Sequence, residues 1–351
     1  MKDKMLEIKQ NLNLANYTTM KLGGAAQHFA TLNDESEIPK LVKFAKNQNL
    51  PIFILGGGSN TIVGDAGFAG LVIKNEILGR KIAYEDETSV EFDLGAGENW
   101  DKFVHYAVDK KNLSGAEAMV MIPGTVGALP IQNVGAYGQE TSDIFVSLKA
   151  YNLETGKFET LDAEACEFGY RDSIFRAHAS GKYIITSVRL KLFKKPPTPP
   201  YYAAIEKYFT DRDIALEDVT TQEIMNAVVK IRSNKLPNPN EIASSGSFFK
   251  NAIITSEKAS ELRQEFGENI PLFALENGDY KIATGWMIDK AGLRGKMIHG
   301  MRPHSGNALV LTNISAKNYA DLAAARTEIQ QKVFEKFDIE IAQEPPAIRE
   351  S

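Results

Sequence analysis

Apolar residues recur three or four positions apart in four stretches of the chain, as they do on the buried face of a helix. These stretches cover residues 38–45, 100–108, 224–231 and 322–337. Ser36 is placed to cap the first helix, and Pro39 falls in its first turn. Thr220 and Glu223 have the spacing of a capping box ahead of the third helix. We therefore expect four amphipathic helices.

Other stretches have the alternating or continuous apolar pattern of strands. They are the two apolar runs within residues 52–73, the alternation at Val90, Phe92 and Leu94, and the alternation over residues 183–193. We expect a hairpin that turns at Thr155 and Gly156, and a closing strand over residues 338–348. Because strands and helices do not alternate regularly, the pattern favours an α+β fold over a doubly wound sheet.

The composition narrows the class of protein. The chain has 351 residues, 43% of them hydrophobic and 24% charged, which is typical of a soluble globular protein with two or three domains. Four prolines within residues 194–200 resist both helix and central strand, so we interpret this segment as a domain boundary.

The charge and the rare residue types exclude several kinds of function. A net charge of −5 without a basic stripe argues against nucleic-acid binding. A single cysteine, Cys166, permits no intrachain disulfide, and the five histidines lack metal-ligand spacing, so no metal site is expected. The charged N-terminus resembles no signal peptide, and no apolar run is long enough to span a membrane. We expect a cytoplasmic protein.

Three consecutive glycines, Gly56, Gly57 and Gly58, interrupt the two apolar runs near residue 60. A Rossmann fingerprint would need a third glycine where Thr61 stands and a helix after it, but the following residues are strand-like. The loop is therefore a plain turn or a cradle of backbone amides for phosphate. We expect Gly57 to need backbone angles that a β-branched residue disfavours.

A second glycine-rich stretch, residues 121–140, favours the phosphate cradle over the plain turn. It carries Gly124, Gly127, Gly135 and Gly138 among Thr125, Gln132 and Asn133. Two such loops in one domain suit an extended ligand with a pyrophosphate at its centre.

Four motifs, in this order along the chain, resemble the UDP-N-acetylenolpyruvoylglucosamine reductase (MurB) family. They are LGGGSNTIV, IPGTVGALPIQNVGAYGQE, FGYRDSIFR and SSGSFFKN. The resemblance extends from NYTTMKLGG to EPPAI, nearly the whole chain. It implies a PCMH-type (vanillyl-alcohol-oxidase-type) FAD-binding domain of two α+β subdomains at residues 11–200. It also implies an α+β substrate-binding domain at 201–330 and a tail, 331–351, that returns to the FAD domain.

The resemblance implies noncovalent FAD, because neither glycine loop contains a His or Cys to attach flavin. The cofactor contacts would be Gly56, Gly57, Gly58, Ser59, Asn60, Gly124, Thr125, Gly127, Gln132, Asn133 and Gly135. NADPH would be the co-substrate, and hydride would pass by way of the flavin to UDP-N-acetylglucosamine enolpyruvate in peptidoglycan synthesis.

Three residues match the family's catalytic positions, although each has a simpler explanation. Arg171 would polarise the substrate carboxylate, but its spacing also suits a surface pair with Asp172. Ser247 would give a proton to the α-carbon, but Ser after Gly is commonly a turn residue. Glu344 would assist if burial kept it neutral, but an acid near a chain end is usually solvated.

The resemblance also places substrate contacts at Tyr137, Tyr202, Lys235, Asn251 and Asn307. Tyr201 makes the register of the tyrosine uncertain by one residue, and a mobile segment around it would close over the nucleotide. Two rival functions remain: an oxidase on the same flavin scaffold, and a flavin- or UDP-sugar-binding protein without catalysis. We expect a monomer.

Overall fold

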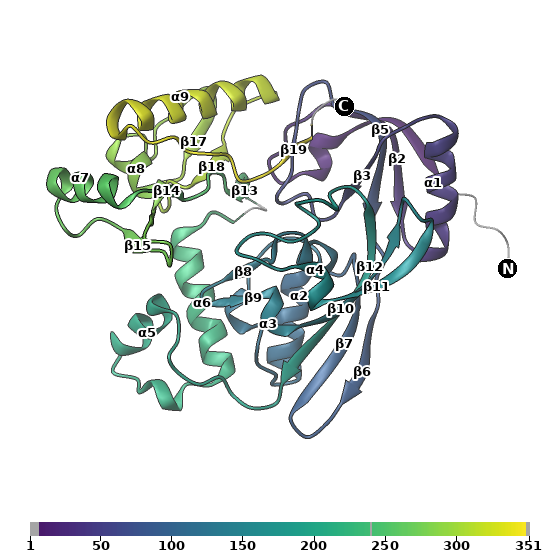
Figure 1. Cartoon of the computed structure of the whole chain (residues 1–351), viewed down its shortest axis with the longest axis horizontal. Coiled ribbons are helices and arrows are strands. Elements are labelled where there is room, and N and C mark those ends of the chain that lie inside the picture. The colour runs from purple at the N-terminus through teal and green to yellow at the C-terminus, as the bar shows by residue number, and fades with distance from the viewer. Residues whose placement is uncertain (1–6, 239–240, 349–351) are drawn as a thin grey trace.

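A computed structural model of the chain describes residues 7–238 and 241–348. The first sheet has the order β1-β2-β5-β3, with β1 antiparallel to β2 and the other two pairs parallel (Figure 1). Its strands are β1 (Ile8–Asn13), β2 (Ala25–Leu32), β3 (Ile52–Leu55) and β5 (Phe68–Asn75). Helix α1 (Ile38–Asn47) buries its predicted apolar stripe. The expected cap was wrong: the Asp34 side chain, not Ser36, accepts the first backbone bond, in a 3₁₀ turn at Glu35–Glu37.

The second sheet is antiparallel, with the order β11-β10-β12-β7-β6. Its strands are β6 (Arg80–Glu85), β7 (Ser89–Gly95), β10 (Phe145–Asn152), β11 (Lys157–Asp162) and β12 (Tyr183–Phe193). The strands predicted at Val90–Leu94 and 183–193 and the hairpin at Thr155 are thereby confirmed.

Short elements fill the rest of the N-terminal half. They are η1 (Leu14–Tyr17), β4 (Ile62–Val63), η4 (Glu117–Met119), η5 (Val126–Ala128), η6 (Pro130–Gln132), β8 (Gly135–Ala136), β9 (Gln139–Glu140), α3 (Thr141–Ile144) and α4 (Ala163–Cys166). The stretch after the first glycine loop is thus strand, not helix, as expected. The segment from residue 121 to 140 is irregular, also as expected.

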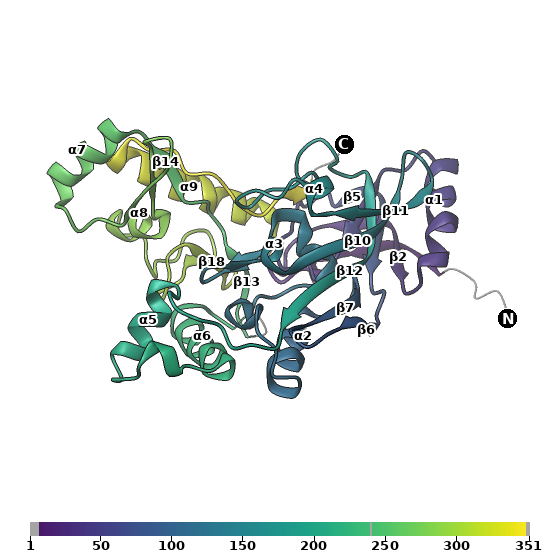
Figure 2. The same cartoon turned by 60° about the horizontal axis from the view of Figure 1, so that its bottom comes forward.

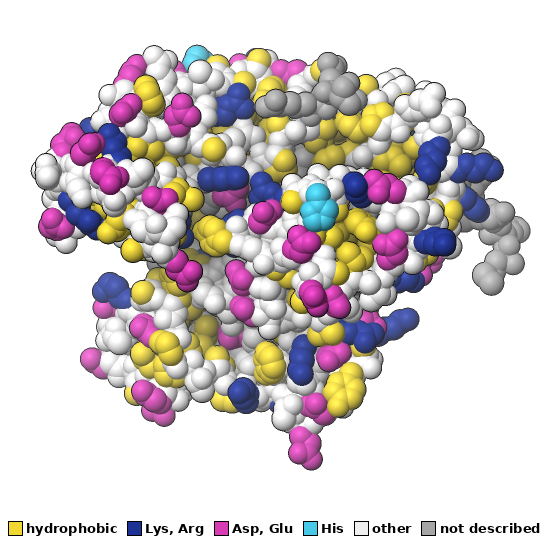
Figure 3. Space-filling view, in the orientation of Figure 1, with side chains coloured by type: hydrophobic (Ala, Val, Ile, Leu, Met, Phe, Trp, Pro, Cys, Tyr) yellow, Lys and Arg dark blue, Asp and Glu magenta, His cyan; other side chains and the backbone are white. Residues whose placement is uncertain are grey.

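The C-terminal part forms a separate lobe, which Figures 1 and 2 show beside the two sheets. It has two small antiparallel sheets and three helices. The strands are β13 (Ala243–Ser247), β14 (Ala252–Ile254), β15 (Leu272–Ala274), β16 (Tyr280–Ile282), β17 (Met301–Pro303) and β18 (Val310–Asn313); the helices are α7 (Ser256–Phe266), α8 (Thr284–Lys290) and α9 (Tyr319–Phe337). Figure 3 shows the surface hollowed between this lobe and the one that carries α5 (Ala203–Thr210) and α6 (Thr221–Lys235).

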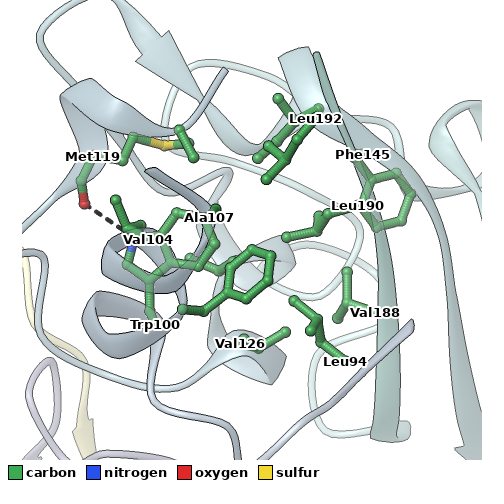
Figure 4. Close-up of a cluster of buried hydrophobic side chains, with 14 of the residues drawn as sticks. Leu94, Trp100, Val104, Ala107, Met119, Val126, Phe145, Val188, Leu190 and Leu192 are labelled. Carbon is green, nitrogen blue, oxygen red and sulfur yellow. Dashed lines mark hydrogen bonds between the residues drawn. The ribbon is translucent and has the colours of Figure 1, made fainter. Parts of the chain in front are cut away.

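The core of the second sheet extends past the proline segment. Helix α2 (Trp100–His105), continued by a π-helical turn (Tyr106–Lys110), packs on the sheet, and the Trp100 indole donates to the Met119 carbonyl at 3.0 Å (Figure 4). Phe209 of α5 and Ile224 of α6 belong to the same core. The capping box of α6 is confirmed. The domain boundary near residue 200 stays a prediction; a short turn, η7 (Leu216–Asp218), joins the two helices.

The chain end crosses back toward the first sheet. Only β19 (Ala347–Ile348) forms a regular strand, parallel to β4. The closing strand predicted over residues 338–348 is therefore wrong for most of its length. Pro345 and Pro346 have no N–H to donate to a ladder, so the segment makes single backbone bonds instead.

A segment near the N-terminus packs against the C-terminal lobe. Met20 and Leu22, together with Ile62, lie in the hydrophobic core of the C-terminal lobe. The two ends of the chain thus join the lobes on the side of the first glycine loop. Across residues 7–238 and 241–348, no helix has the length and apolarity that a membrane crossing requires.

Candidate active site

The two glycine-rich loops lie against each other. A Cβ built on Gly57 would stand 2.8 Å from the Cα of Gly124, so the two backbones are in direct contact. Gly58 and Gly124 have positive φ angles of 67° and 125°. Gly57 has no positive φ, so the expectation that its backbone angles exclude a β-branched residue is wrong. A side chain at Gly57 is excluded because its Cβ would clash with Gly124. The Ser59 hydroxyl fastens the loops by donating to the Pro123 carbonyl at 3.1 Å.

Several backbone N–H groups at this junction have no acceptor. Over the described parts of the chain, the amides of residues 57–60 and those of Gly124 and Thr125 donate to no protein group. Unpaired amides from two adjoining loops form a cradle for an anion, and a pyrophosphate would fit it. The N–H of Gly127 is instead bonded to the Ala96 carbonyl at 2.9 Å, so this glycine serves the packing of the loop.

The side chains predicted to contact a cofactor are partly engaged by the protein. The Gln132 Oε1 atom accepts a bond from Asn60 Nδ2 at 3.2 Å. Asn133 is buried, and its amide bonds to Ser142 and to the Gly169 carbonyl. A cofactor contact of Asn133 would therefore have to use its backbone. Its side chain holds the segment that carries Arg171 next to the second glycine loop.

Arg171 lies on that segment in a left-handed backbone conformation, with φ at 55°. Its guanidinium donates to the Gly135 carbonyl at 2.6 Å and to the Asn133 carbonyl at 3.4 Å. Within residues 7–238 and 241–348 no ion pair joins it to Asp172, so the surface pair considered from the sequence does not form. Two carbonyls occupy two of its five N–H groups, and the others remain as donors.

Glu344 is brought to the same place by the returning tail. Its N–H donates to the Phe248 carbonyl at 2.9 Å, and the Lys250 N–H donates to the Ala342 carbonyl at 2.8 Å. Burial raises the pKa of Glu344, while the positive charges of Arg171, Arg176 and Lys250 oppose that rise. Glu344 is half-buried, so the solvated tail acid considered from the sequence does not form, and partial desolvation favours the neutral carboxyl.

Ser247 ends strand β13, one residue before Phe248, which receives the Glu344 bond. Gly246, with φ at 71°, makes the bulge that separates Ser247 from the rest of the strand pairing. Ser244 and Ser245 are each 4% exposed, whereas Ser247 is half-buried. Ser247 is therefore the hydroxyl of this motif that a ligand can reach. The three predicted catalytic positions come together from three distant parts of the chain.

Tyr201 and Tyr202 differ in their bonds and in their exposure. The Tyr201 hydroxyl donates to the carbonyls of Pro197 and Leu216, so this ring is part of the fold. Tyr202 is 51% exposed, and its ring meets that of Tyr137 edge to face, with centroids 5.5 Å apart. Tyr202 and Tyr137 thus form one aromatic surface beside the second glycine loop.

The other predicted substrate residues surround the end of α6. Lys235 is exposed at that end, and its backbone bonds to the His304 ring. Asn251 accepts from the Thr284 N–H at 3.1 Å, and Asn307 accepts from the Leu309 N–H at 3.1 Å. The oxygens of both amides thus shape their loops.

Sequence reasoning missed Arg232, which lies one helical turn before Lys235 on α6. It donates to the Met121 carbonyl at 3.2 Å, and burial lowers its pKa. Among the residues that the structure describes, its buried Nε atom has no hydrogen-bond partner. Its charge acts on Tyr137. A cation spaced three residues from a predicted diphosphate contact, on the same helix face, was the available signal.

Comparisons with known proteins agree across the whole chain. A family model described as an FAD binding domain matches residues 26–162, and one described as the UDP-N-acetylenolpyruvoylglucosamine reductase C-terminal domain matches residues 238–348. UDP-N-acetylenolpyruvoylglucosamine reductase of Burkholderia ambifaria is 36% identical, covering 99% of this chain and 98% of the relative. The Flavobacterium johnsoniae protein of that name is 37% identical, covering 97% and 99%.

A solved structure shows the same fold. The crystal structure of UDP-N-acetylenolpyruvylglucosamine reductase (MurB) from Thermus caldophilus matches with a TM-score of 0.65 at 23% identity. The match covers 98% of this chain and 99% of that one. The α+β fold expected from the sequence is thus confirmed.

Proposed function

This chain belongs to the UDP-N-acetylenolpyruvoylglucosamine reductase family, and on that premise we propose that it converts UDP-N-acetylglucosamine enolpyruvate to UDP-N-acetylmuramate with NADPH as electron donor. The observation that carries the proposal is the meeting of Arg171, Ser247 and Glu344 beside a cradle of unpaired amides. The protein would act as a cytoplasmic monomer in peptidoglycan synthesis.

The chain is an FAD-containing oxidoreductase, and FAD supplies hydride transfer to the substrate's double bond. The unpaired amides of residues 57–60, Gly124 and Thr125 would hold the pyrophosphate of the cofactor. Tyr137, Tyr202, Lys235, Asn251 and Asn307 would hold the UDP-sugar, with Arg232 as a further cation at the end of α6.

The catalytic side chains act on the charge that develops when hydride adds to the terminal methylene carbon. That addition leaves an enolate on the α-carbon and its carboxylate. Arg171 has N–H groups left to bind the carboxylate, because two backbone carbonyls hold the guanidinium in place without neutralising it. Glu344, made less acidic by burial, would share a proton with the same carboxylate. Ser247 would deliver a proton to the α-carbon.

The test is the visible spectrum of the purified protein during anaerobic addition of NADPH and then of the enolpyruvyl substrate. We expect a flavin spectrum that NADPH bleaches and the substrate restores. A flavin that only oxygen restores would favour the oxidase on this scaffold. Ligand binding without any bleaching would favour the non-catalytic alternative. A colourless protein that FAD does not reconstitute would overturn the proposal.

A further inference from the structure

Arg176 is a half-buried cation whose bonds all go to uncharged groups. It closes the same segment as Arg171, and within residues 7–238 and 241–348 no carboxylate lies at ion-pair distance from it. Its Nη1 atom donates to the Gln132 side chain at 3.0 Å and to the Arg171 carbonyl at 3.3 Å. Burying part of a guanidinium without a paired carboxylate is unfavourable unless hydrogen bonds compensate for the lost hydration.

These bonds join the two glycine loops to a catalytic position. The Gln132 oxygen that receives Arg176 also receives the Asn60 amide, at 3.2 Å, from the first glycine loop. The Arg171 carbonyl that receives Arg176 belongs to a residue with a left-handed backbone, a conformation that neighbouring contacts must hold. A continuous set of hydrogen bonds thus runs from Asn60 through Gln132 and Arg176 to the backbone of Arg171.

Arg176 also acts on Glu344 through its charge. The charged groups that face Glu344 are Arg171 and Arg176 from one segment and Lys250 from the loop between β13 and β14, whose N–H bonds to the tail. Each favours the ionised carboxylate, against the burial that favours the neutral acid. Removing one of them would make Glu344 harder to ionise.

We propose that Arg176 is a positioning residue for the reductase reaction: its hydrogen bonds tie the two glycine loops to the backbone of Arg171. This role rests on the proposed function. It predicts that Arg176 affects the step in which the substrate takes up hydride and a proton, and not the step in which NADPH reduces the flavin.

The experiment measures the two half-reactions of the FAD-loaded full chain by anaerobic stopped-flow absorbance, as a function of pH. The variants are Arg176→Gln, which removes the charge, and Arg176→Lys, which keeps it. The matched control is Arg189→Gln, because Arg189 is also half-buried but pairs with Asp93 on the second sheet, at 2.7 Å.

For Arg176→Gln we expect normal flavin content and normal reduction of the flavin by NADPH. Reoxidation by substrate should be slower by about 10- to 100-fold, because a charge-assisted hydrogen bond is lost. Since neutral Glu344 is the active form, reoxidation should fall at alkaline pH. The pH of this fall should move upward in Arg176→Gln, because a positive charge has gone. Arg176→Lys should keep the parent's pH dependence and recover most of the rate. In a Glu344→Gln background the shift should disappear.

Three results would overturn this role alone. Arg176→Gln could reoxidise as fast as Arg189→Gln. It could lose flavin and slow both half-reactions equally at an unchanged pH dependence, which would make Arg176 a purely structural residue. If Arg176→Gln does not fold, a displaced pH dependence in Arg176→Lys would count against the charge effect. A parent that NADPH reduces but the substrate cannot reoxidise would overturn the proposed function, and this role with it.

Discussion

Replacing Gly57 by Ala should weaken FAD binding through a single contact. The new Cβ would stand 2.8 Å from the Gly124 Cα, whereas carbon atoms in contact prefer about 3.5 Å or more. The loops would have to separate by about 0.7 Å, which lengthens a hydrogen bond of about 2.9 Å to beyond its useful range. The backbone of Gly57 itself permits alanine, because its φ is not positive.

The magnitude follows from the bonds at risk. One charge-assisted hydrogen bond from an amide to a phosphate contributes about 1.5–3 kcal/mol, so Kd for FAD should rise by about 10- to 150-fold. The assay is a titration of the apoprotein with FAD, followed by flavin fluorescence, with thermal unfolding as a check on the fold. Gly64→Ala is the control, since a Cβ there meets only the Ile348 carbonyl, at 3.8 Å. FAD affinity within twofold of the parent in Gly57→Ala would refute the cradle.

Three further predictions concern the catalytic and substrate residues. Ser247→Ala should leave flavin reduction by NADPH intact and slow reoxidation by substrate by about 10²- to 10⁴-fold in stopped-flow absorbance, while Ser245→Ala changes neither; equal rates in Ser247→Ala would assign the proton to another donor. Glu344→Gln should raise Tm at pH 8, because the pKa of Glu344 is raised in the folded state and its ionised form therefore opposes folding at that pH. The gain in Tm should fade below about pH 4.5, where the parent's carboxyl is protonated in both the folded and the unfolded state. A gain equal at both pH values would contradict this. Protease cleavage within residues 194–210 should slow when UDP is added, if Tyr202 closes over the nucleotide; equal cleavage would remove that lid.

Local patterns in the sequence were enough to predict four of the helices and several strands of the first two sheets. Helix α1 and strand β12 were recognisable because one residue in three or four, or every second residue, must face a core. The prediction failed where a competing local bond decided the outcome, as when Asp34 capped the turn in place of Ser36. It failed again in the tail, where two prolines and a crossing between lobes prevent a continuous ladder.

The candidate site was predictable only in part. The motifs, through their resemblance to a family, indicated Arg171, Ser247 and Glu344, but spacing alone favoured a simpler explanation for each. Arg176 and Arg232 were not predicted because their closeness to a motif or to Lys235 gives only a weak local signal. Their importance depends on partners such as Gln132 and Tyr137, far away in the chain.

By itself, the sequence determined several of the longer helices and strands, the α+β class and the presence of two glycine loops, because these depend on side chains a few positions apart. Tertiary structure alone decided that the loops touch at Gly57 and Gly124, that Tyr202 and not Tyr201 faces outward, and that Glu344 is half-buried near three cations. The physical reason is that steric contact, desolvation and charge act through space. A carboxyl near the chain end changes its acidity only when folding removes water from it and brings charged groups from distant parts of the chain close to it.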